Sequence, residues 1–363
     1  MNAVWMILVC LAAVLIEIWI CRSFSLKKLR YSRTFDRASA VEGEQVVVVE
    51  VLRNQKLLPV PWLRIESRIS PFLQFGNQEN LDVTRDQYHR SVFFLPAFKQ
   101  ITRRHLVTCK RRGFYNLNTA TMVSGDLFGL GQAARQLDLN AELSVYPRLL
   151  GEAEMDAPTQ RWQGDVLMKR WIMPDPYLIN GIREYGVGDT MRDIHWKATA
   201  RTGKLQVKTH DFTAQPKLLI YLNIQPDEKL WSELGEEDKR LAEYGISLAA
   251  TLAARALSQG MEVGFFCNGA VLGTKNPVRV LPQSGEGQFT VLMEAMARLA
   301  LLRTLSFPSM LAEDADGGLT GMDILVLSPY WSEAVELAAQ NLRRRGNALA
   351  YLPLSREEVP QSA

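Results

Sequence analysis

The stretch from residue 181 to residue 208, GIREYGVGDTMRDIHWKATARTGKLQVK, decides the fold of this chain. Glycine, charged and aromatic residues crowd together there, between two segments with ordinary globular patterns. We expect a helix over residues 190–200, because the Asp189 carboxylate can cap its first amides. Trp196 and Arg192 are four residues apart and would share one face of that helix. Gly203 should end the helix, and residues 204–209 should form a strand.

The segment that follows alternates apolar strands with amphipathic helices. This alternation predicts a mainly parallel sheet with helices on both faces. Strands are expected at residues 218–224, 261–267, 323–327 and 348–352, with a β-pair near 271–281 and helices at 236–258, 286–302 and 331–345.

The 181–208 segment resembles the signature of the bacterial family catalogued as domain of unknown function 58. The resemblance implies a von Willebrand factor type A-like α/β fold, with a MoxR-type AAA+ ATPase and often a transglutaminase-like membrane protein as partners. The family has no defined biochemistry. The matching residues are Arg183, Glu184, Tyr185, Gly188, Asp189, Arg192, Ile194, Trp196, Lys197, Thr199, Ala200 and Arg201.

The metal loop of that fold is altered in this sequence. Type A domains hold a divalent cation through an Asp-x-Ser-x-Ser loop at the end of the first strand, where open α/β sheets place their ligands. The corresponding residues are Asn223, Gln225 and Asp227, and Ser328 follows a later strand. Hard cations need several carboxylate or carbonyl oxygens. We therefore expect a degenerate site that binds no metal, and we expect no cofactor.

The region before the linker has the pattern of an all-β domain. Short runs rich in β-branched and aromatic residues recur between turn signals, which indicates an antiparallel, Ig-like sandwich over residues 31–150. The clearest runs are residues 45–52, 62–69, 91–95, 100–108, 114–123 and 143–146. His89 and His105 show no metal-ligand spacing, and a packing or surface role is expected for both.

The amino terminus is expected to be a single transmembrane anchor, residues 1–22. Residues 3–20 are apolar except Glu17 and would span about 27 Å as a helix, close to the thickness of a bilayer core. A cleaved signal peptide is the alternative, but no basic residue precedes the apolar run. The flanking basic residues place the body in the cytoplasm, at the inner membrane. They are Arg22, Lys27, Lys28, Arg30, Arg33 and Arg37.

Composition narrows the choice of function. The net charge of +3 and the dispersed basic residues argue against a nucleic-acid partner. The four cysteines show no metal-ligand spacing. No phosphate loop, nucleophile elbow or zinc-protease motif occurs. Residues 151–180 read as a linker, and residues 181–355 as the signature followed by the α/β domain.

We expect the signature to be chiefly a structural joint, with a docking surface and an enzyme centre as the alternatives. As a structural joint, it would bury Trp196 in a core and join Arg183, Glu184, Asp189, Arg192 and Arg201 in an ion-pair network. As a docking surface, it would present these residues and His195 to a partner protein. As the centre of a hydrolase, it would use His195 with a nucleophile such as Cys267 or Ser328. We expect a non-enzymatic, membrane-anchored interaction or scaffold protein that acts in envelope assembly or remodelling, and an enzyme is the alternative.

Overall fold

The computed structural model describes residues 2–76, 81–83, 88–126, 132–151, 154, 179–186, 194–210, 217–228 and 233–356. The chain divides into two compact units. One comprises residues 1–148 with 296–298, and the other comprises residues 149–295 with 299–363. The predicted linker over residues 151–180 lies mostly outside the described residues.

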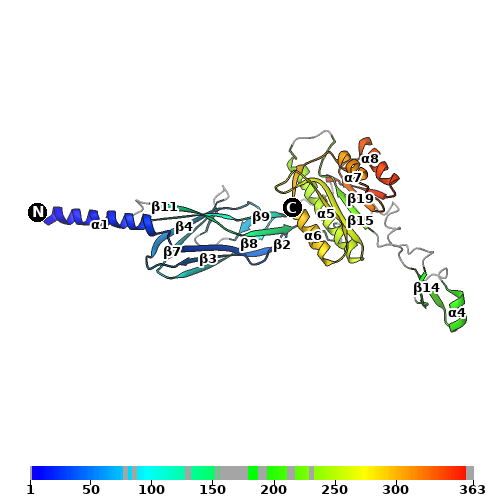
Figure 1. Cartoon of the computed structure of the whole chain (residues 1–363), viewed down its shortest axis with the longest axis horizontal. Helices are drawn as coiled ribbons and strands as arrows, with labels where there is room; N and C mark the ends of the chain where they lie inside the picture. The colour runs from blue at the N-terminus through cyan, green and yellow to red at the C-terminus, as the bar shows by residue number, and fades with distance from the viewer. Residues whose placement is uncertain are drawn as a thin grey trace. The chain divides into compact units, whose positions relative to one another are not determined.

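The first unit begins with one apolar helix, α1 (Asn2–Phe24). An 18-residue window, Val4–Cys21, is long and apolar enough to cross a bilayer, and only 6% of it is buried within the structure. Signal sequences share these properties. The helix leads directly into the β-sandwich (Figure 1).

The sandwich is built from antiparallel sheets. One sheet has the order β1-β3-β8-β5 and the other β11-β10-β4-β7-β6, while a small third sheet, β2-β12-β9, adds one parallel pair. The strands are β1 (Leu29–Phe35), β2 (Ser39–Val41), β3 (Gln45–Asn54), β4 (Val60–Arg68), β5 (Leu73–Phe75), β6 (Leu81–Val83), β7 (Tyr88–Leu95), β8 (Gln100–Cys109), β9 (Gly113–Asn116), β10 (Thr119–Gly125), β11 (Gln132–Asp138) and β12 (Glu142–Tyr146).

The predicted all-β region is confirmed, but strands β1, β2, β5, β6 and β11 were not among the predicted runs, and one predicted run is divided. Residues 114–123 were expected to form one strand. Instead, β9 and β10 belong to different sheets, because the chain turns at residues 117–118. There the Asn116 and Asn118 side chains accept backbone N–H groups of Asn118 and Ala141. Asparagine commonly stabilises turns in this way.

The second unit contains the mixed sheet β17-β16-β15-β19-β20. Strands β15 (Lys217–Leu222), β16 (Glu262–Val271), β19 (Asp323–Ser328) and β20 (Ala348–Pro353) run parallel, while β17 (Pro277–Gln283) and β18 (Leu299–Arg303) pair antiparallel with β16. The predicted parallel α/β sheet is thus confirmed, with β17 as an antiparallel edge.

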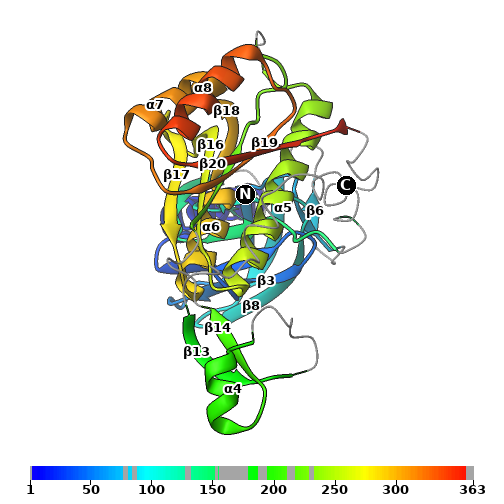
Figure 2. The same cartoon turned by 90° about the vertical axis from the view of Figure 1, so that its right-hand side faces the viewer.

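Helices cover both faces of this sheet (Figure 2). Helices α7 (Phe307–Asp316) and α8 (Glu333–Arg344) pack over Leu219, Tyr221, Ile324 and Val326 on one face. Helix α5 (Glu236–Ser258) approaches the opposite face closely at Gly245. A Cβ there would lie 2.8 Å from Leu222 Cδ1, so any larger residue would have to displace the Leu222 side chain.

Two features of the second unit differ from the sequence expectation. Helix α6 (Glu286–Ala297) stops before Leu302, and residues 299–303 form β18 instead. The Leu299 side chain packs against β16 at Gly269, where the missing side chain leaves room for it. Helix α7 was not anticipated, although Ser306 caps it and Pro308 lies in its first turn, both common signals of a helix start.

Candidate functional site

The signature folds as a two-stranded hairpin that carries a short helix. Strand β13 (Ile179–Glu184) pairs antiparallel with β14 (Gln206–His210). Helix α4 (Trp196–Thr202) lies between them in the chain. Ile194 forms an isolated bridge with Val207, and both side chains are buried. This pair is the small apolar centre of what we call the signature hairpin, residues 179–186 with 194–210.

The ends of α4 are fixed by His195 and Gly203. His195 Nδ1 accepts a hydrogen bond from the Ala198 N–H at 3.0 Å and so caps the helix. The predicted helix start at residue 190 is wrong, because Ile194 is in extended pairing and the helix begins two residues later. Gly203 closes the helix in the left-handed conformation (φ 71°), as expected.

Trp196 is 68% exposed, so the prediction that it fills a core site is wrong. It is the first residue of α4, whereas Ile194 and Val207 are the buried apolar side chains among the described residues of the hairpin. Ile182 (47% exposed), Leu205 (45%) and Tyr185 (38%) are also large and unburied. The hairpin therefore displays apolar and aromatic side chains on its surface.

The charged residues of the hairpin are exposed as well. Glu184 pairs with Lys204 at 3.0 Å, and both side chains are more than 60% exposed. Arg183 Nη1 donates to the Glu184 carbonyl at 3.3 Å. Lys197 and Arg201 are also exposed. Asp189 and Arg192, which the proposed ion-pair network requires, lie outside the described residues, as does Gly188 of the signature.

The second candidate site lies where β15 and β19 end, at the position of the expected metal loop. Asn223, Gln225, Asn268 and Ser328 are all buried there. Asn223 Nδ2 donates to Ser328 Oγ at 2.9 Å, and Asn223 Oδ1 accepts from Asn268 Nδ2 at 2.9 Å. Asn223 Oδ1 also accepts from the Gln225 N–H, and Asn268 Oδ1 accepts from the Ile224 N–H.

These hydrogen bonds tie the strand ends to one another through neutral amides and a hydroxyl. The oxygen atoms that would face a cation already accept hydrogen bonds from amide groups, while Asp227 is exposed. The adjacent cavity has a volume of about 10 Å³, near the size of one water molecule. Within the described residues, no group of three His, Cys, Asp or Glu side chains could hold a metal ion. Burial raises the pKa of nearby Tyr330 to about 12, so its phenol is neutral at physiological pH.

The groups considered for nucleophilic catalysis have other roles. Ser328 Oγ donates to the Tyr330 carbonyl at 2.7 Å and accepts from Asn223. Cys267 is fully buried in β16, where its Sγ accepts from the Gly269 N–H. His195 Nδ1 is engaged in capping α4. These contacts of Ser328, Cys267 and His195 stabilise local structure.

A buried charged cluster within the sandwich was missed by the sequence analysis. The carboxylate of Glu50 accepts hydrogen bonds from Arg33 Nη2 and from the Tyr31 hydroxyl, both at 2.8 Å. His105 Nε2 lies 3.0 Å from its second oxygen. Arg33 Nη1 then donates to Ser67 Oγ on β4, which links the two sheets. His89 lies in β7, and its side chain is outside the described residues.

The sequence did carry a signal for this cluster. Glu50 alternates in phase with Val46, Val48 and Leu52, which all point into the core. It divides the core in two, because Val46 and Val48 belong to one apolar cluster and Leu52 to another. Burial raises the pKa of Tyr31 above its ordinary value, so this phenol stays neutral and donates to Glu50.

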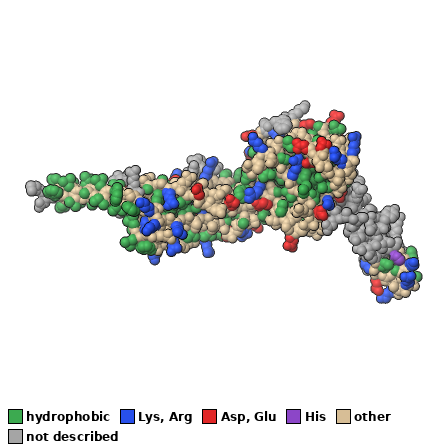
Figure 3. Space-filling view, viewed as in Figure 1, with side chains coloured by type: hydrophobic (Ala, Val, Ile, Leu, Met, Phe, Trp, Pro, Cys, Tyr) green, Lys and Arg blue, Asp and Glu red, His purple; other side chains and the backbone are tan. Residues whose placement is uncertain are grey.

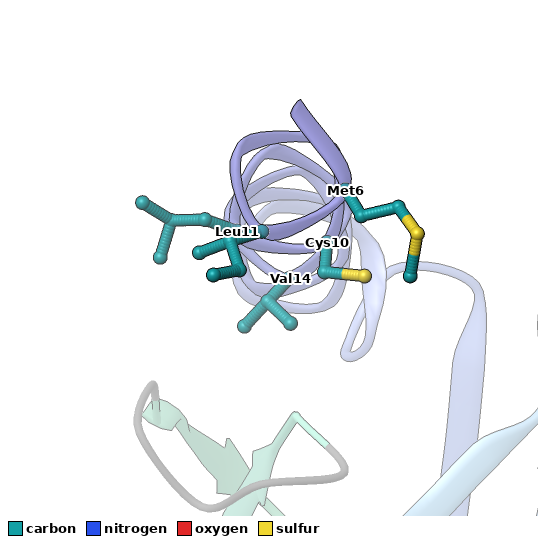
Figure 4. A pocket seen from close by; sticks show the side chains of 5 residues that line it. Met6, Cys10, Leu11 and Val14 are labelled. Atoms are coloured by element: carbon teal, nitrogen blue, oxygen red, sulfur yellow. The ribbon is translucent and has the colours of Figure 1, made fainter. Parts of the chain in front are cut away.

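Helix α1 has a hollow on its surface, and this hollow is not a candidate binding site for a polar ligand. The hollow is lined by Met6, Ile7, Cys10, Leu11 and Val14, all from this one helix. Figure 4 shows their side chains projecting outward from the helix. Such a face suits contact with lipid or another apolar helix, because it supplies no group to orient a polar ligand.

Comparison with known protein families identifies the domain that contains the signature hairpin. Residues 181–315 match the family described as "Protein of unknown function DUF58". The chain therefore carries a DUF58 family domain. This domain comprises most of the signature hairpin, from Gly181 onward, and the sheet up to α7.

One relative of this chain is the uncharacterized protein YeaD of Bacillus subtilis (strain 168). The two are 21% identical over 203 residues, which covers 55% of this chain and 49% of YeaD. The chain thus matches about half the length of this relative. YeaD is a distant homologue, and its name assigns no activity.

Several solved structures resemble about a third of the chain. One is the seventh ScaB type I cohesin of Pseudobacteroides cellulosolvens. It is 9% identical, and the match covers 32% of this chain and 91% of the cohesin chain (TM-score 0.21). Another is the major pilin SpaD of Corynebacterium diphtheriae. It is 9% identical, and the match covers 31% of this chain and 34% of the pilin chain (TM-score 0.25). Similarity at this level says nothing about function.

Proposed function

We propose that the protein is a membrane-anchored, non-enzymatic interaction protein, and that the signature hairpin is its docking surface. The exposure of Trp196 carries this proposal. Exposed tryptophan, tyrosine and arginine dominate the energetics of protein interfaces. Here Trp196, Tyr185 and Arg201 are exposed together on one small element.

The local architecture supports a presenting role for the hairpin. A two-stranded hairpin with a seven-residue helix buries few apolar side chains of its own, and Ile194 and Val207 are the buried ones among its described residues. A motif kept for stability would turn its largest apolar residue inward, whereas Trp196 faces solvent. A motif kept for binding leaves that residue available to a partner.

Helix α1 supplies the anchor in this proposal. Its length and apolarity suit a membrane span, and the basic residues that follow it favour a body on the cytoplasmic side of the inner membrane. By analogy with the family, the partner we propose is a MoxR-type AAA+ ATPase, which would remodel envelope proteins held at the membrane. The network at Asn223 supports a role without a metal cofactor, because its acceptors are already satisfied.

The experiment compares partner capture by matched variants. The full-length, affinity-tagged chain is purified from its own membranes as wild type, Trp196→Ser and Leu337→Ser. Leu337 is a fitting control because it is 62% exposed on α8, away from the signature in sequence. We expect the AAA+ ATPase to co-purify with wild type and Leu337→Ser and to be lost with Trp196→Ser. Equal recovery with all three would overturn the docking role.

A second pair of variants separates docking from catalysis. His195→Asn removes the imidazole but keeps a side-chain oxygen that can cap α4, whereas His195→Ala removes both. We expect His195→Asn to complement a deletion strain as wild type does. Loss of complementation in His195→Asn, with ATPase capture intact, would favour the hydrolase alternative.

A further inference from the structure

The end of the sandwich next to α1 is formed by three connected segments. They are the turn after α1 (residues 24–28), the β3–β4 turn (55–59) and the β7–β8 turn (96–99), which together we call the collar. The Lys56 ammonium donates to the carbonyls of Phe24, Ser25 and Lys27. The Phe98 N–H donates to the Lys56 carbonyl at 3.2 Å. These bonds fix both sandwich turns to the carboxyl end of the apolar helix (Figure 1).

Large apolar side chains point outward from the collar. Leu57 is 77% exposed, Phe98 is 65% exposed and Phe24 is 41% exposed. Leu57 and Phe98 lie in turns, where a soluble domain would ordinarily carry polar residues, and Phe24 is the last residue of α1. Phe98 also has a left-handed backbone (φ 52°), and Lys28 shares that conformation (φ 53°). Among the described residues, these two are the non-glycine positions with positive φ, and such strain concentrates at functional sites.

The collar and its flanks are uniformly basic. Segments 22–30, 53–59 and 96–99 contain seven basic residues and no acidic one. Figure 3 shows Lys and Arg side chains gathered over the part of the sandwich next to α1. Those with described side chains are exposed or half-buried. The seven are Arg22, Lys27, Lys28, Arg30, Arg53, Lys56 and Lys99.

We propose that the collar is a second membrane contact, seated in the headgroup layer of an anionic bilayer. The inference rests on the proposed anchor, because α1 sets the depth of the collar. Phe24 follows the end of the apolar window at Cys21 by three residues, a rise of about 4.5 Å in a helix. The headgroup layer extends roughly 5–7 Å beyond the hydrocarbon core. Aromatic residues favour that layer, and lysines near it attract anionic lipids.

The lipid surface explains the exposed residues better than a protein partner does. A membrane contact requires apolar tips and basic charge at one depth, and the bonds from Lys56 to the end of α1 hold both turns there. Anchoring the sandwich at its turns as well as through α1 would also restrict its tilt relative to the membrane. If the sandwich were attached to α1 only through a flexible linker, it could tilt freely relative to the membrane.

The test measures depth in nanodiscs with the full-length protein. A fluorescent amino acid is placed at Leu57, Phe98 or Gln45, and nitroxides are attached to the lipid headgroups. Gln45 is the control, because it is exposed and starts β3, about 30 Å from the collar end of that strand. We expect quenching at residues 57 and 98 to exceed that at residue 45 several-fold, and to increase when anionic lipid is added. Equal quenching at all three positions would overturn the proposal.

Two controls keep the outcome unambiguous. Fluorescence at Leu8, quenched by nitroxides on the acyl chains, reports on the anchor alone. If Leu8 is unquenched, the proposed anchor itself is wrong. The second control is the triple variant Lys27→Gln, Lys28→Gln, Lys99→Gln. Its thermal unfolding should match that of the wild type, which shows that the fold is preserved. Adding anionic lipid should no longer increase the quenching at residue 57. Unchanged quenching there would mean that charge does not hold the collar to the membrane.

Discussion

Trp196 and Ile194 are two residues apart and have opposite environments. Trp196 is 68% exposed, whereas Ile194 is 4% exposed and bridges Val207. Residue spacing alone did not predict which of the two is buried, because a helix that starts at residue 190 would have turned Trp196 inward. The actual helix starts at Trp196, and extended pairing turns Ile194 inward instead.

The two residues should therefore respond differently to truncation. Trp196→Ser should change the free energy of local unfolding by no more than about 0.5 kcal/mol, as is typical of exposed sites. Ile194→Ala should destabilise the signature hairpin by about 2–5 kcal/mol, or as much as its own stability allows. Hydrogen exchange of the amides of residues 194–210 measures both. Faster exchange in Trp196→Ser would restore the structural-joint hypothesis.

At the scale of elements, the pattern of apolar and polar residues was the main basis for predicting the strands. It indicated most of the longer sandwich strands and the parallel sheet. It also contained a signal that was not used, because Glu50 shares the inward face of β3 with Val48 and Leu52. The partners of Glu50 were not predictable, because only the sheet register brings them near it. Arg33 on β1 lies opposite Glu50, and His105 on β8 lies opposite Val48, two residues away. The same holds for Asn268, which meets Asn223 across two neighbouring parallel strands.

The buried cluster gives a prediction for the sandwich. Glu50→Ala leaves the Arg33 guanidinium buried without its carboxylate and should cost about 3–5 kcal/mol of stability. Glu66→Ala is the control, because its pairs with Arg64 and Arg90 are partly exposed and should contribute less than about 1 kcal/mol. Urea unfolding followed for the sandwich compares them. Similar midpoints for the two variants would refute the importance of the buried pair.

The network at the ends of β15 and β19 gives a prediction for the α/β sheet. Adding Mg²⁺ or Ca²⁺ should leave the melting temperature of the wild-type protein unchanged, because the Asn223 and Asn268 oxygens already accept hydrogen bonds. A bound cation at a hundred times its Kd would add about 2.7 kcal/mol of stability. A rise in melting temperature that disappears in Asp227→Ala would show that the site still binds metal.

At the scale of the whole molecule, the sequence indicated an apolar helix, a β-sandwich and an α/β domain, in that order. It left the role of the signature open, because the types of residue in a joint and in a docking surface are the same. The exposure of Trp196 distinguishes a docking surface from a joint, and that exposure depends on the residue at which α4 starts. The comparisons name the family of residues 181–315 without naming an activity, so the docking role must be tested directly.

The most direct test places a photo-crosslinking amino acid at Lys197, which is exposed on α4 beside Trp196. The full-length protein is irradiated in its native membranes, and crosslinked peptides are identified by mass spectrometry. The docking account predicts crosslinks to the AAA+ ATPase that disappear in the Trp196→Ser background. Crosslinks confined to other segments of the same chain, and unchanged by Trp196→Ser, would contradict it.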